Sequence, residues 1–286
     1  MQVSKETGAV RLVDRKPSGL SRRSFFTGAT ALGAAGALGL GGLFNSTAAL
    51  GQDEHDKEDL IQTGAAGDKN ILLVAEIAEA LAVTTYTHII ESAPFFTRLP
   101  KDDQGYLVAA RQEEMSHYLL EKSVTAEPTP YTEFFYPLDM FADAQTTLNV
   151  LVTLEDAFIA AYLLGVRHFS MADLRVTAAR IMGIESDHRT LARVLAGDVA
   201  AQDGGPIIKI TGFQGHKENA DPPNNNGYER TLCLTNIDQA VNALLPFLDF
   251  ASAWEAGFDT SKTYAFHSFT PKLPNPLGDF ISFTGC

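Results

Sequence analysis

The sequence has little cysteine: Cys233 and Cys286 are the only two in a chain of 286 residues. Neither lies in a Cys-x-x-Cys pair or a Cys/His cluster, which argues against a cysteine-bound zinc site. In an oxidising compartment the two could form a disulfide that ties the C-terminus back to the segment before the last predicted helix. Two unpaired thiols are the equal alternative, because a sequence does not show whether their Cα atoms come within bridging distance.

Positive charge is also scarce outside the N-terminal region. The chain carries 22 basic and 35 acidic side chains, a net charge of −13. Residues 1–48 hold six of the basic and two of the acidic side chains, so the remainder of the chain stands at −17. A surface of this sign repels the phosphates of nucleic acids and the headgroups of anionic lipids. The composition therefore argues against nucleic-acid binding and against peripheral membrane binding.

The N-terminal region lacks the run of about 20 strongly apolar residues that a membrane span requires. The stretch from Gly28 to Leu50 is dominated by alanine and glycine and is interrupted at Asn45–Thr47. It follows the pair Arg22-Arg23, and a twin-arginine pair before a modest apolar stretch predicts a twin-arginine export signal. We expect the signal to cover residues 1–48 and to be cleaved near its end, with an uncleaved signal anchor as the alternative. The protein is then periplasmic, bound to the cell envelope or extracellular, with no stable membrane span after cleavage.

Two tetrapeptides repeat the same spacing of a carboxylate and an imidazole. In Glu114–His117 and in Glu185–His188 the two side chains stand three residues apart, so on a helix they leave the same face one turn apart. Each tetrapeptide is preceded by an apolar segment with a central glutamate, Glu79 before the first and Glu155 before the second. The order Glu, Glu-x-x-His, Glu, Glu-x-x-His is the ligand set of a four-helix bundle that carries two carboxylate-bridged metals.

On these motifs the chain resembles the ferritin-like superfamily, whose di-iron and di-manganese proteins share this ligand order. Tyr86 follows Glu79 by seven residues and Tyr162 follows Glu155 by seven residues, so each tyrosine is expected on the face of its glutamate, two turns away. The stretch Pro222–Glu229, followed by an apolar helix, is similar to the family that includes plant desiccation-related proteins.

The predicted fold class is all-α: a ferritin-like four-helix bundle over residues 70–198, with a long crossover between its second and third helices. Apolar periodicity places the four helices at residues 71–92, 102–124, 143–169 and 171–196. Asp102 is the expected cap of the second helix, and Gly197 is expected to end the fourth.

The segments around the bundle are predicted as follows. Residues 49–69 are charged and glycine-rich and form a flexible linker. Residues 125–141 form the crossover, packed down by aromatic side chains at 134–136. Residues 199–286 form an extension with a short β-like stretch at 207–210, one helix at 236–250 on the outside of the bundle, and an aromatic-rich tail from Trp254 that wraps the domain.

A common cation explains why every predicted bundle helix carries an ionisable group in its apolar stripe. Burying a carboxylate without a partner costs several kcal/mol, and two divalent ions would neutralise four glutamates and two histidines almost completely. The lone glutamates would each bind one metal terminally, the glutamates of the tetrapeptides would bridge, and each histidine would complete one metal's shell. The predicted ligands are Glu79, Glu114, His117, Glu155, Glu185 and His188.

Some roles near the predicted ligands stay open at this stage. Glu76 competes with Glu79 for the ligand role, although Glu79 lies deeper in the stripe and has the tyrosine partner. Glu113 is either a support for the ligands or solvated. Tyr86 and Tyr162 either pack in the core or act at the site, where they would hydrogen-bond ligand carboxylates or donate an electron.

Carboxylate and imidazole ligands favour iron or manganese over metals that prefer softer ligands, although zinc also accepts them. The symmetric pair of tetrapeptides favours iron, since in manganese catalases the last helix lacks the full motif. The leading hypothesis is an exported redox protein that oxidises Fe(II) or reacts with dioxygen or peroxide. The alternatives are a structural or desiccation- and stress-protective envelope protein with a structural or vestigial metal site and no turnover, and a silent bundle whose acidic surface docks a partner. Assembly into a homo-oligomer is left open.

Overall fold

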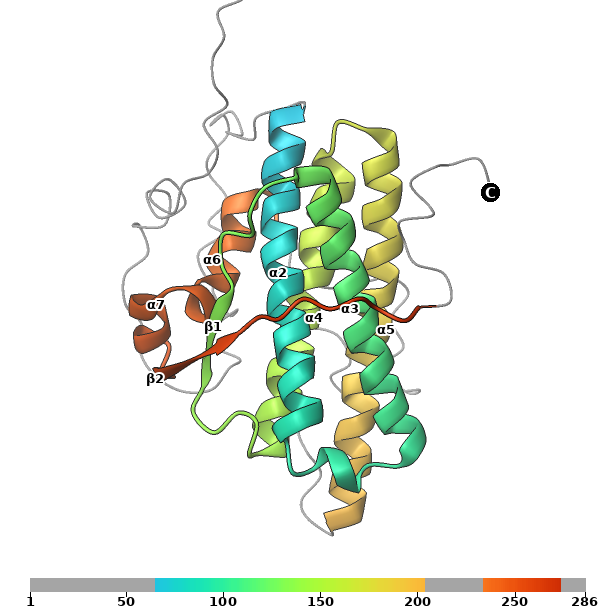
Figure 1. Cartoon of the computed structure of the whole chain (residues 1–286), viewed down its shortest axis with the longest axis vertical. Helices are drawn as coiled ribbons and strands as arrows, with labels where there is room; N and C mark the ends of the chain where they lie inside the picture. The colour runs from blue at the N-terminus through green and yellow to red at the C-terminus, as the bar shows by residue number, and fades with distance from the viewer. Residues whose placement is uncertain (1–64, 204–233, 274–286) are drawn as a thin grey trace, which may run out of the picture.

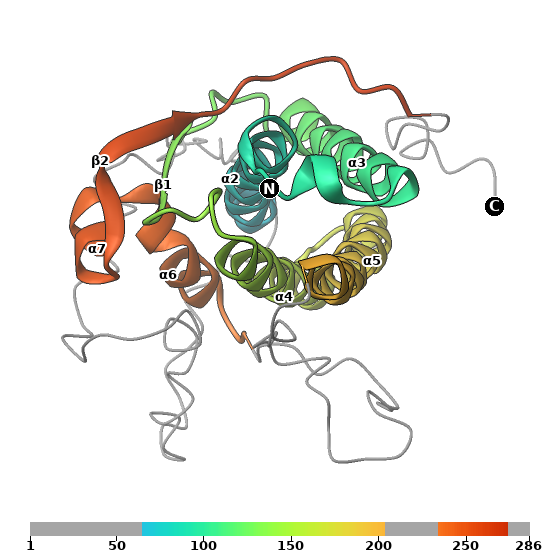
Figure 2. The ribbon, with the colours of Figure 1, turned by 90° about the horizontal axis from the view of Figure 1, so that it is seen from below.

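The computed structural model describes residues 65–203 and 234–273 (Figure 1). Four long helices surround a shared core and lie at the corners of a square when seen along the bundle (Figure 2). They are α2 (Ala65–Ser92), α3 (Lys101–Thr125), α4 (Ala144–His168) and α5 (Ala172–Asp203). Helix α2 packs closely with α3, joined through the short helix η3 (Phe96–Arg98), and α4 packs closely with α5. The predicted four-helix bundle with two helix pairs is therefore confirmed.

A long crossover joins the two pairs, as predicted, because α3 and α4 run in the same direction (Figure 1). Part of this crossover is the strand β1 (Glu133–Pro137), which pairs antiparallel with β2 (Phe258–Ala265). The ladder has an irregularity between Phe134 and Tyr136, and both of these aromatic side chains are buried. The small sheet is the feature that the all-α prediction missed. The sequence indicates this sheet only weakly, because the two strands are short and lie far apart along the chain.

The C-terminal extension packs on the outside of the bundle. Helix α6 (Ile237–Leu248) lies against α2, α4 and β1, and the short helix α7 (Phe250–Glu255) follows it. The helix predicted at 236–250 is thus divided at Asp249, whose side chain accepts a hydrogen bond from the backbone N–H of Ser252 and caps α7.

The described part of the tail after β2 crosses the face formed by α2 and α3, as the prediction of a wrapping tail required (Figure 1). The ring of Phe266 lies 4.7 Å from the ring of Tyr118, measured between centroids. Further along, the backbone N–H of Lys272 donates to Oε1 of Gln112 at 2.8 Å.

The helix ends differ from the predicted ones in three places. Helix α2 begins at Ala65, inside the predicted linker, and α5 continues through Gly197 to Asp203. A glycine inside a helix costs only about 1 kcal/mol relative to alanine, so it does not by itself end one. The N-cap of α3 is Pro100, which makes no side-chain cap, so Asp102 lies within the first turn instead.

The early start of α2 has a tertiary cause. Asp68, in its first turn, is buried and accepts a hydrogen bond of 2.7 Å from the backbone N–H of Ser170, between α4 and α5. Several predictions fall outside the described residues: the export signal, most of the linker, the stretches at 207–210 and 222–229, and the two cysteines.

Two bundle helices are long and apolar enough to cross a membrane by length and composition alone. They are the segments Gly67–Ser92 of α2 and Ala144–His168 of α4. However, 78% and 72% of their most apolar windows is buried inside the fold. Packing in the bundle core accounts for this apolar character.

Candidate metal centre

Six ionisable side chains meet in the middle of the bundle, and each is at most 3% exposed. Every bundle helix contributes at least one of them, because apolar neighbours on the same face pull that face into the core. They are Glu79 from α2, Glu114 and His117 from α3, Glu155 from α4, and Glu185 and His188 from α5. The structure thus brings together all six residues that the repeated spacing singled out.

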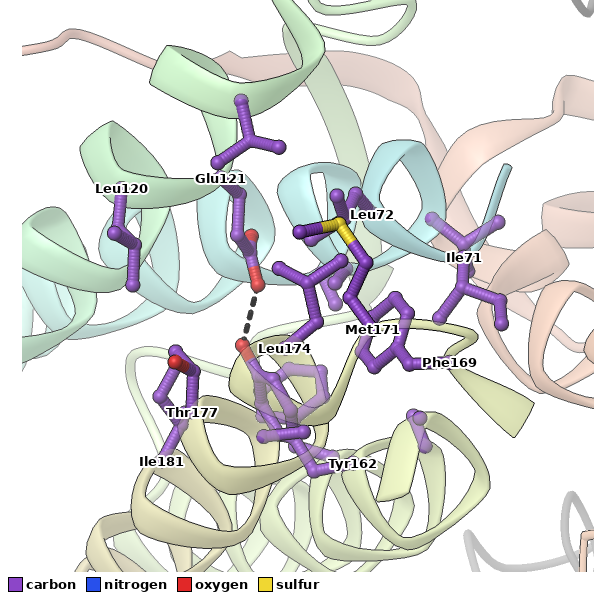
Figure 3. A pocket seen from close by; sticks show the side chains of 18 of the residues that line it. Ile71, Leu72, Leu120, Glu121, Tyr162, Phe169, Met171, Leu174, Thr177 and Ile181 are labelled. Atoms are coloured by element: carbon purple, nitrogen blue, oxygen red, sulfur yellow. Dashed lines mark hydrogen bonds between the residues drawn. The ribbon is translucent and has the colours of Figure 1, made fainter. Parts of the chain in front are cut away.

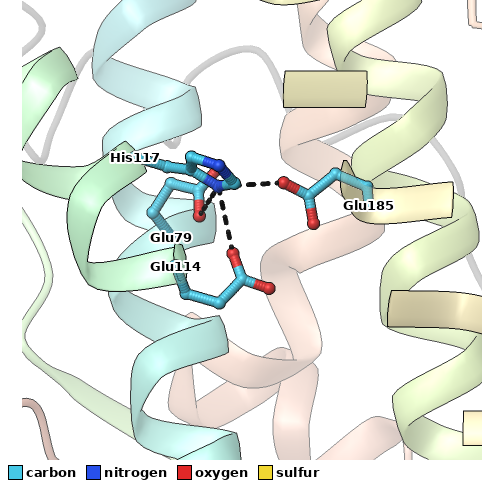
Figure 4. A group of neighbouring side chains, drawn as sticks. All are labelled: Glu79, Glu114, His117 and Glu185. Atoms are coloured by element: carbon cyan, nitrogen blue, oxygen red, sulfur yellow. Dashed lines mark ion pairs between the residues drawn. The ribbon is translucent and has the colours of Figure 1, made fainter. Parts of the chain in front are cut away.

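The six residues form two overlapping groups of four. In each group the potential ligand atoms lie within 4.8 Å of one another. One group contains Glu79, Glu114, His117 and Glu185 (Figure 4), and the other contains Glu114, Glu155, Glu185 and His188. Glu114 and Glu185 belong to both groups, which is the position of carboxylates that bridge two ions.

The polar atoms of this cluster that face one another lack hydrogen-bond partners among the described residues. Nδ1 of His117 lies 3.1 Å from Oε1 of Glu185, and Nδ1 of His188 lies 2.9 Å from Oε1 of Glu114. Yet neither nitrogen, nor any of the facing carboxylate oxygens, has a partner of acceptable hydrogen-bond geometry within the described residues. Each buried polar atom left unpaired costs about 1–3 kcal/mol. Oxygen and imidazole ligands that converge without bonding one another fit a pair of divalent ions such as iron or manganese.

The electrostatics of the cluster follow from burial and close charges. Burial raises the pKa of Glu79 and of Glu155 well above the ordinary value, and the neighbouring carboxylates add to the rise. Burial alone would also raise the pKa of Glu114, but the adjacent histidines lower it below its usual range. Burial alone would lower the pKa of His117 and of His188, but the surrounding carboxylates raise it well above normal. Without metal, the cluster therefore retains protons that cations would displace.

The two tyrosines hydrogen-bond to carboxylates of the cluster across the bundle. Tyr86 of α2 donates a hydrogen bond of 2.7 Å to Oε1 of Glu155 on α4. Tyr162 of α4 donates in turn to Glu79 on α2. The sequence predicted each tyrosine on the face of its own glutamate, and the structure shows that each contacts the glutamate of the opposite helix. Both tyrosines are buried and also hydrogen-bond to carboxylates of the cluster.

A further buried carboxyl, Glu121, was missed by the sequence analysis. It is 2% exposed, and its Oε1 lies 2.7 Å from the Tyr162 hydroxyl, which also contacts Glu79. One hydroxyl proton cannot serve two carboxylates, and burial raises the pKa of Glu121 well above its ordinary value, so a proton is shared in this group. The available signal was its spacing: Glu121 follows Glu114 by seven residues and so lies on the same face of α3.

Glu113 orients one of the histidines. Its Oε2 lies 2.9 Å from Nε2 of His188, and this hydrogen bond lowers the pKa of Glu113. In a neutral histidine whose Nε2–H donates to a carboxylate, the lone pair is on Nδ1, and it is Nδ1 of His188 that faces the cluster. The sequence left Glu113 either as a support for the clustered residues or as a solvated side chain, and its contact with His188 favours the first role.

A buried ion pair lies beside Glu155 and His188 of the cluster. Arg189 follows His188 in the sequence and Asp156 follows Glu155, and their Nη1 and Oδ1 atoms lie 2.7 Å apart. Both side chains are 2% exposed. The pair joins α4 to α5 at the level of the ligands, and no sequence motif pointed to it.

Glu76 lies outside the cluster. It is fully buried, but it accepts hydrogen bonds from Thr125 at 2.8 Å and from Thr129, and Nζ of Lys122 lies 3.3 Å away. Its charge is therefore compensated without a metal, and Glu79 is the glutamate of α2 that enters the cluster.

Comparison with known proteins agrees with this arrangement. Residues 67–198 match the family model of a ferritin-like domain, a range that begins near the start of α2, ends inside α5 and includes all six clustered residues. No curated protein and no solved structure matches the chain. The similarity to desiccation-related proteins stays a prediction, because the stretch at 222–229 lies outside the matched range. The bundle, residues 67–198, is therefore a ferritin-like domain.

Proposed function

We propose that this protein binds two divalent metal ions in the centre of its bundle and performs redox chemistry there, as a ferroxidase or in reactions with dioxygen or peroxide. The observation that carries the proposal is the pair of overlapping ligand groups that share Glu114 and Glu185. When bound, two such ions supply open coordination positions and electrons for the reduction of an oxygen species. The symmetric set of tetrapeptides favours iron over manganese.

The surrounding residues prepare the ligands for this task. Glu113 holds the Nε2 proton of His188 and so leaves Nδ1 free to bind. Tyr86 and Tyr162 each fix one carboxylate oxygen of a terminal glutamate and leave Oε2 of Glu79 and of Glu155 turned to the site. Because the cluster is almost completely buried, bulk water is kept from it and the electrostatic interactions inside are strong.

The proposal includes export and the choice of partners. The twin-arginine pair and the alanine-rich stretch of residues 1–48 support export to the periplasm, the envelope or the exterior. The acidic composition argues against nucleic acid and suits a cationic substrate such as Fe(II), and the small-molecule oxidant is part of the proposed redox chemistry.

The test is elemental analysis of the protein from residue 49 onward, produced with both iron and manganese available. We expect about two ions per chain. Glu114→Gln should lose most of both ions, because Glu114 belongs to both groups. Glu76→Gln is the matched control, since Glu76 is equally buried but lies outside the cluster, and it should keep both.

The outcomes separate the hypotheses. A correctly folded protein without metal, or equal metal content in the two variants, would refute the metal centre. Two equivalents of iron together with Fe(II) oxidation support the ferroxidase, and two of manganese with peroxide consumption shift the reaction to peroxide chemistry. Bound metal without turnover of Fe(II), peroxide or dioxygen would instead support a structural, stress-protective bundle.

A further inference from the structure

A cavity of about 190 Å³ lies between the two helix pairs, beside the candidate metal centre (Figure 3). Its wall is almost entirely apolar and includes Ile71, Leu72, Leu120, Phe158, Phe169 and Ile181. Among the lining side chains, Val124 and Met171 are 44% and 56% exposed, which places the mouth of the cavity at the surface near them.

The inner end of the cavity is polar and connects with the ligands. Glu121 and Tyr162 lie there with a hydrogen bond between them (Figure 3), and Tyr162 also contacts the ligand Glu79. Oε2 of Glu121 is buried and has no hydrogen-bond partner within the described residues. An orphaned carboxyl oxygen at the end of an apolar cavity is a binding position for the polar end of a ligand.

We propose that this cavity binds an uncharged, unbranched aliphatic molecule with a hydroxyl group at one end, which bonds to Oε2 of Glu121. A bound alcohol would then be joined to Glu79 by three hydrogen bonds in series: alcohol to Glu121, Glu121 to Tyr162, and Tyr162 to Glu79. The inference deepens the proposed function, since it names the class of molecule that the same site would receive.

The size of the cavity sets the length of the chain. A dry apolar cavity of about 150 Å³ holds benzene, with its six carbons. By the same ratio, a cavity of about 190 Å³ holds about eight non-hydrogen atoms. A primary alcohol of about seven carbons fits this volume.

The acidic residues of the wall argue against an anionic ligand, and its apolar character argues against any charged one. The lining contains the acidic residues Glu121 and Asp173, and no lysine, arginine or histidine is among the described residues that line it. A fatty acid anion would lose its hydration there without gaining a counter-ion, which is costly. A hydroxyl group both donates and accepts, so it satisfies Oε2 of Glu121 whether that carboxyl is protonated or not. A ketone or an ether could only accept.

The first experiment is calorimetric titration of the protein from residue 49 with primary alcohols of four to ten carbons. We expect saturable binding of one molecule whose affinity rises roughly fourfold per methylene up to about seven or eight carbons and then stops rising. Heptanoate and heptylammonium should bind at least tenfold more weakly than 1-heptanol. No saturable binding of any alcohol, or tighter binding of either ion, would overturn the inference.

Variants test the place and the polar contact. Ala161→Phe fills the cavity from α4, and Ala75→Leu fills it from α2 in case the larger residue prevents folding. Whichever folds should weaken 1-heptanol binding at least tenfold, whereas Ala179→Phe, at an exposed position of α5 outside the lining, should not. Glu121→Leu should weaken it about tenfold and Glu121→Gln much less. Unchanged affinity in the filled variants would place the bound alcohol elsewhere.

The orientation and the link to the metal are tested separately. In protein loaded with paramagnetic Mn(II), the C1 protons of bound 1-heptanol should broaden more than its methyl protons, because the hydroxyl end lies nearer the ligands. The opposite order would overturn the orientation. Metal binding without alcohol binding refutes this inference alone, and alcohol binding by a protein that takes up no metal refutes the proposed function alone.

Discussion

Replacing Asp156 by alanine gives the sharpest test of how the bundle holds its buried charges. The carboxylate of Asp156 lies 2.7 Å from Nη1 of Arg189, and both side chains are 2% exposed. In the Asp156→Ala protein the guanidinium of Arg189 would remain buried between α4 and α5 and would lose its 2.7 Å contact with the Asp156 carboxylate.

The expected cost follows from this burial. Removing one partner of a buried ion pair destabilises a protein by about 3–5 kcal/mol, because the other charge stays uncompensated. Total stabilities are about 5–15 kcal/mol, so the loss is a large fraction of the total. For a chain of this size each kcal/mol corresponds to about 2–4 °C in Tm, which gives a decrease of roughly 6–20 °C.

The assay is urea and thermal unfolding of the metal-free protein, followed by circular dichroism. Asp187→Ala is the control, because Asp187 lies on the same helix as Arg189, two residues away, but is exposed. The double variant Asp156→Leu, Arg189→Met removes both charges and should be more stable than Asp156→Ala. A loss below about 1 kcal/mol in Asp156→Ala, or a double variant less stable than the single one, would refute the reasoning.

Three further predictions concern the tyrosines, a helix cap and pH. Tyr162→Phe should destabilise the metal-free protein by about 1–3 kcal/mol in urea unfolding. The loss should exceed that of Tyr86→Phe, because the Tyr162 hydroxyl contacts two buried carboxyl groups and the Tyr86 hydroxyl contacts one. Equal losses in the two variants would contradict this. Asp143→Ala should cost about 1 kcal/mol and Asp143→Asn much less, since this side chain caps α4; identical melting of the two variants would speak against the cap. Burial raises the pKa of Glu79 and of Glu155. Above the ordinary carboxyl pKa the metal-free folded state therefore binds more protons than the unfolded state, and the stability of the metal-free protein falls as pH rises. Bound metal displaces these protons, so the difference in Tm between loaded and metal-free protein should grow from pH 5 to pH 8, and a difference that shrinks over this range would be the contrary result.

The parts of the site that were predictable are those that depend on local geometry. A spacing of three residues between Glu114 and His117 fixes their common face once the segment is helical, whatever the rest of the chain does. The two tetrapeptides and the two preceding glutamates therefore predicted all six members of the cluster. Glu79 was chosen over Glu76 for its place in the apolar stripe and for the tyrosine seven residues on, although both glutamates are buried and Tyr86 contacts Glu155.

The parts that were not predictable depend on partners far apart in the sequence. The strands β1 and β2 are stable because they pair with each other, and more than a hundred residues separate them. Helix α2 begins early because Asp68 finds the backbone of Ser170 across the bundle. Likewise, the hydrogen bonds of Tyr86 and Tyr162 to the opposite helices depend on how the helices are rotated, and the spacing along one helix does not determine that rotation.

The two halves of the candidate metal centre are alike in their clustered glutamates and histidines and differ in the residues around them. Counting from the ligands, the positions of Glu113 and Glu121 on α3 are occupied by Ile184 and Ala192 on α5. The positions of Asp156 and Arg189 beside the second group are occupied by Ala80 and Tyr118 beside the first. The ion pair and Glu113 therefore belong to the half with His188, whereas Glu121 and the apolar cavity belong to the half with Glu79.

This difference could have been found in the sequence. Once the repeat of Glu-x-x-His is recognised, the sequences of the two helix pairs can be aligned on it. Every aligned position that holds a charged residue in one pair and an apolar residue in the other marks a place where the halves differ in function or packing. Such an alignment predicts two inequivalent metal positions rather than a symmetric pair. The repeat thus predicts the metal ligands, and the departures from it indicate where one half of the site is fixed by buried charges and where the other half is open to a ligand.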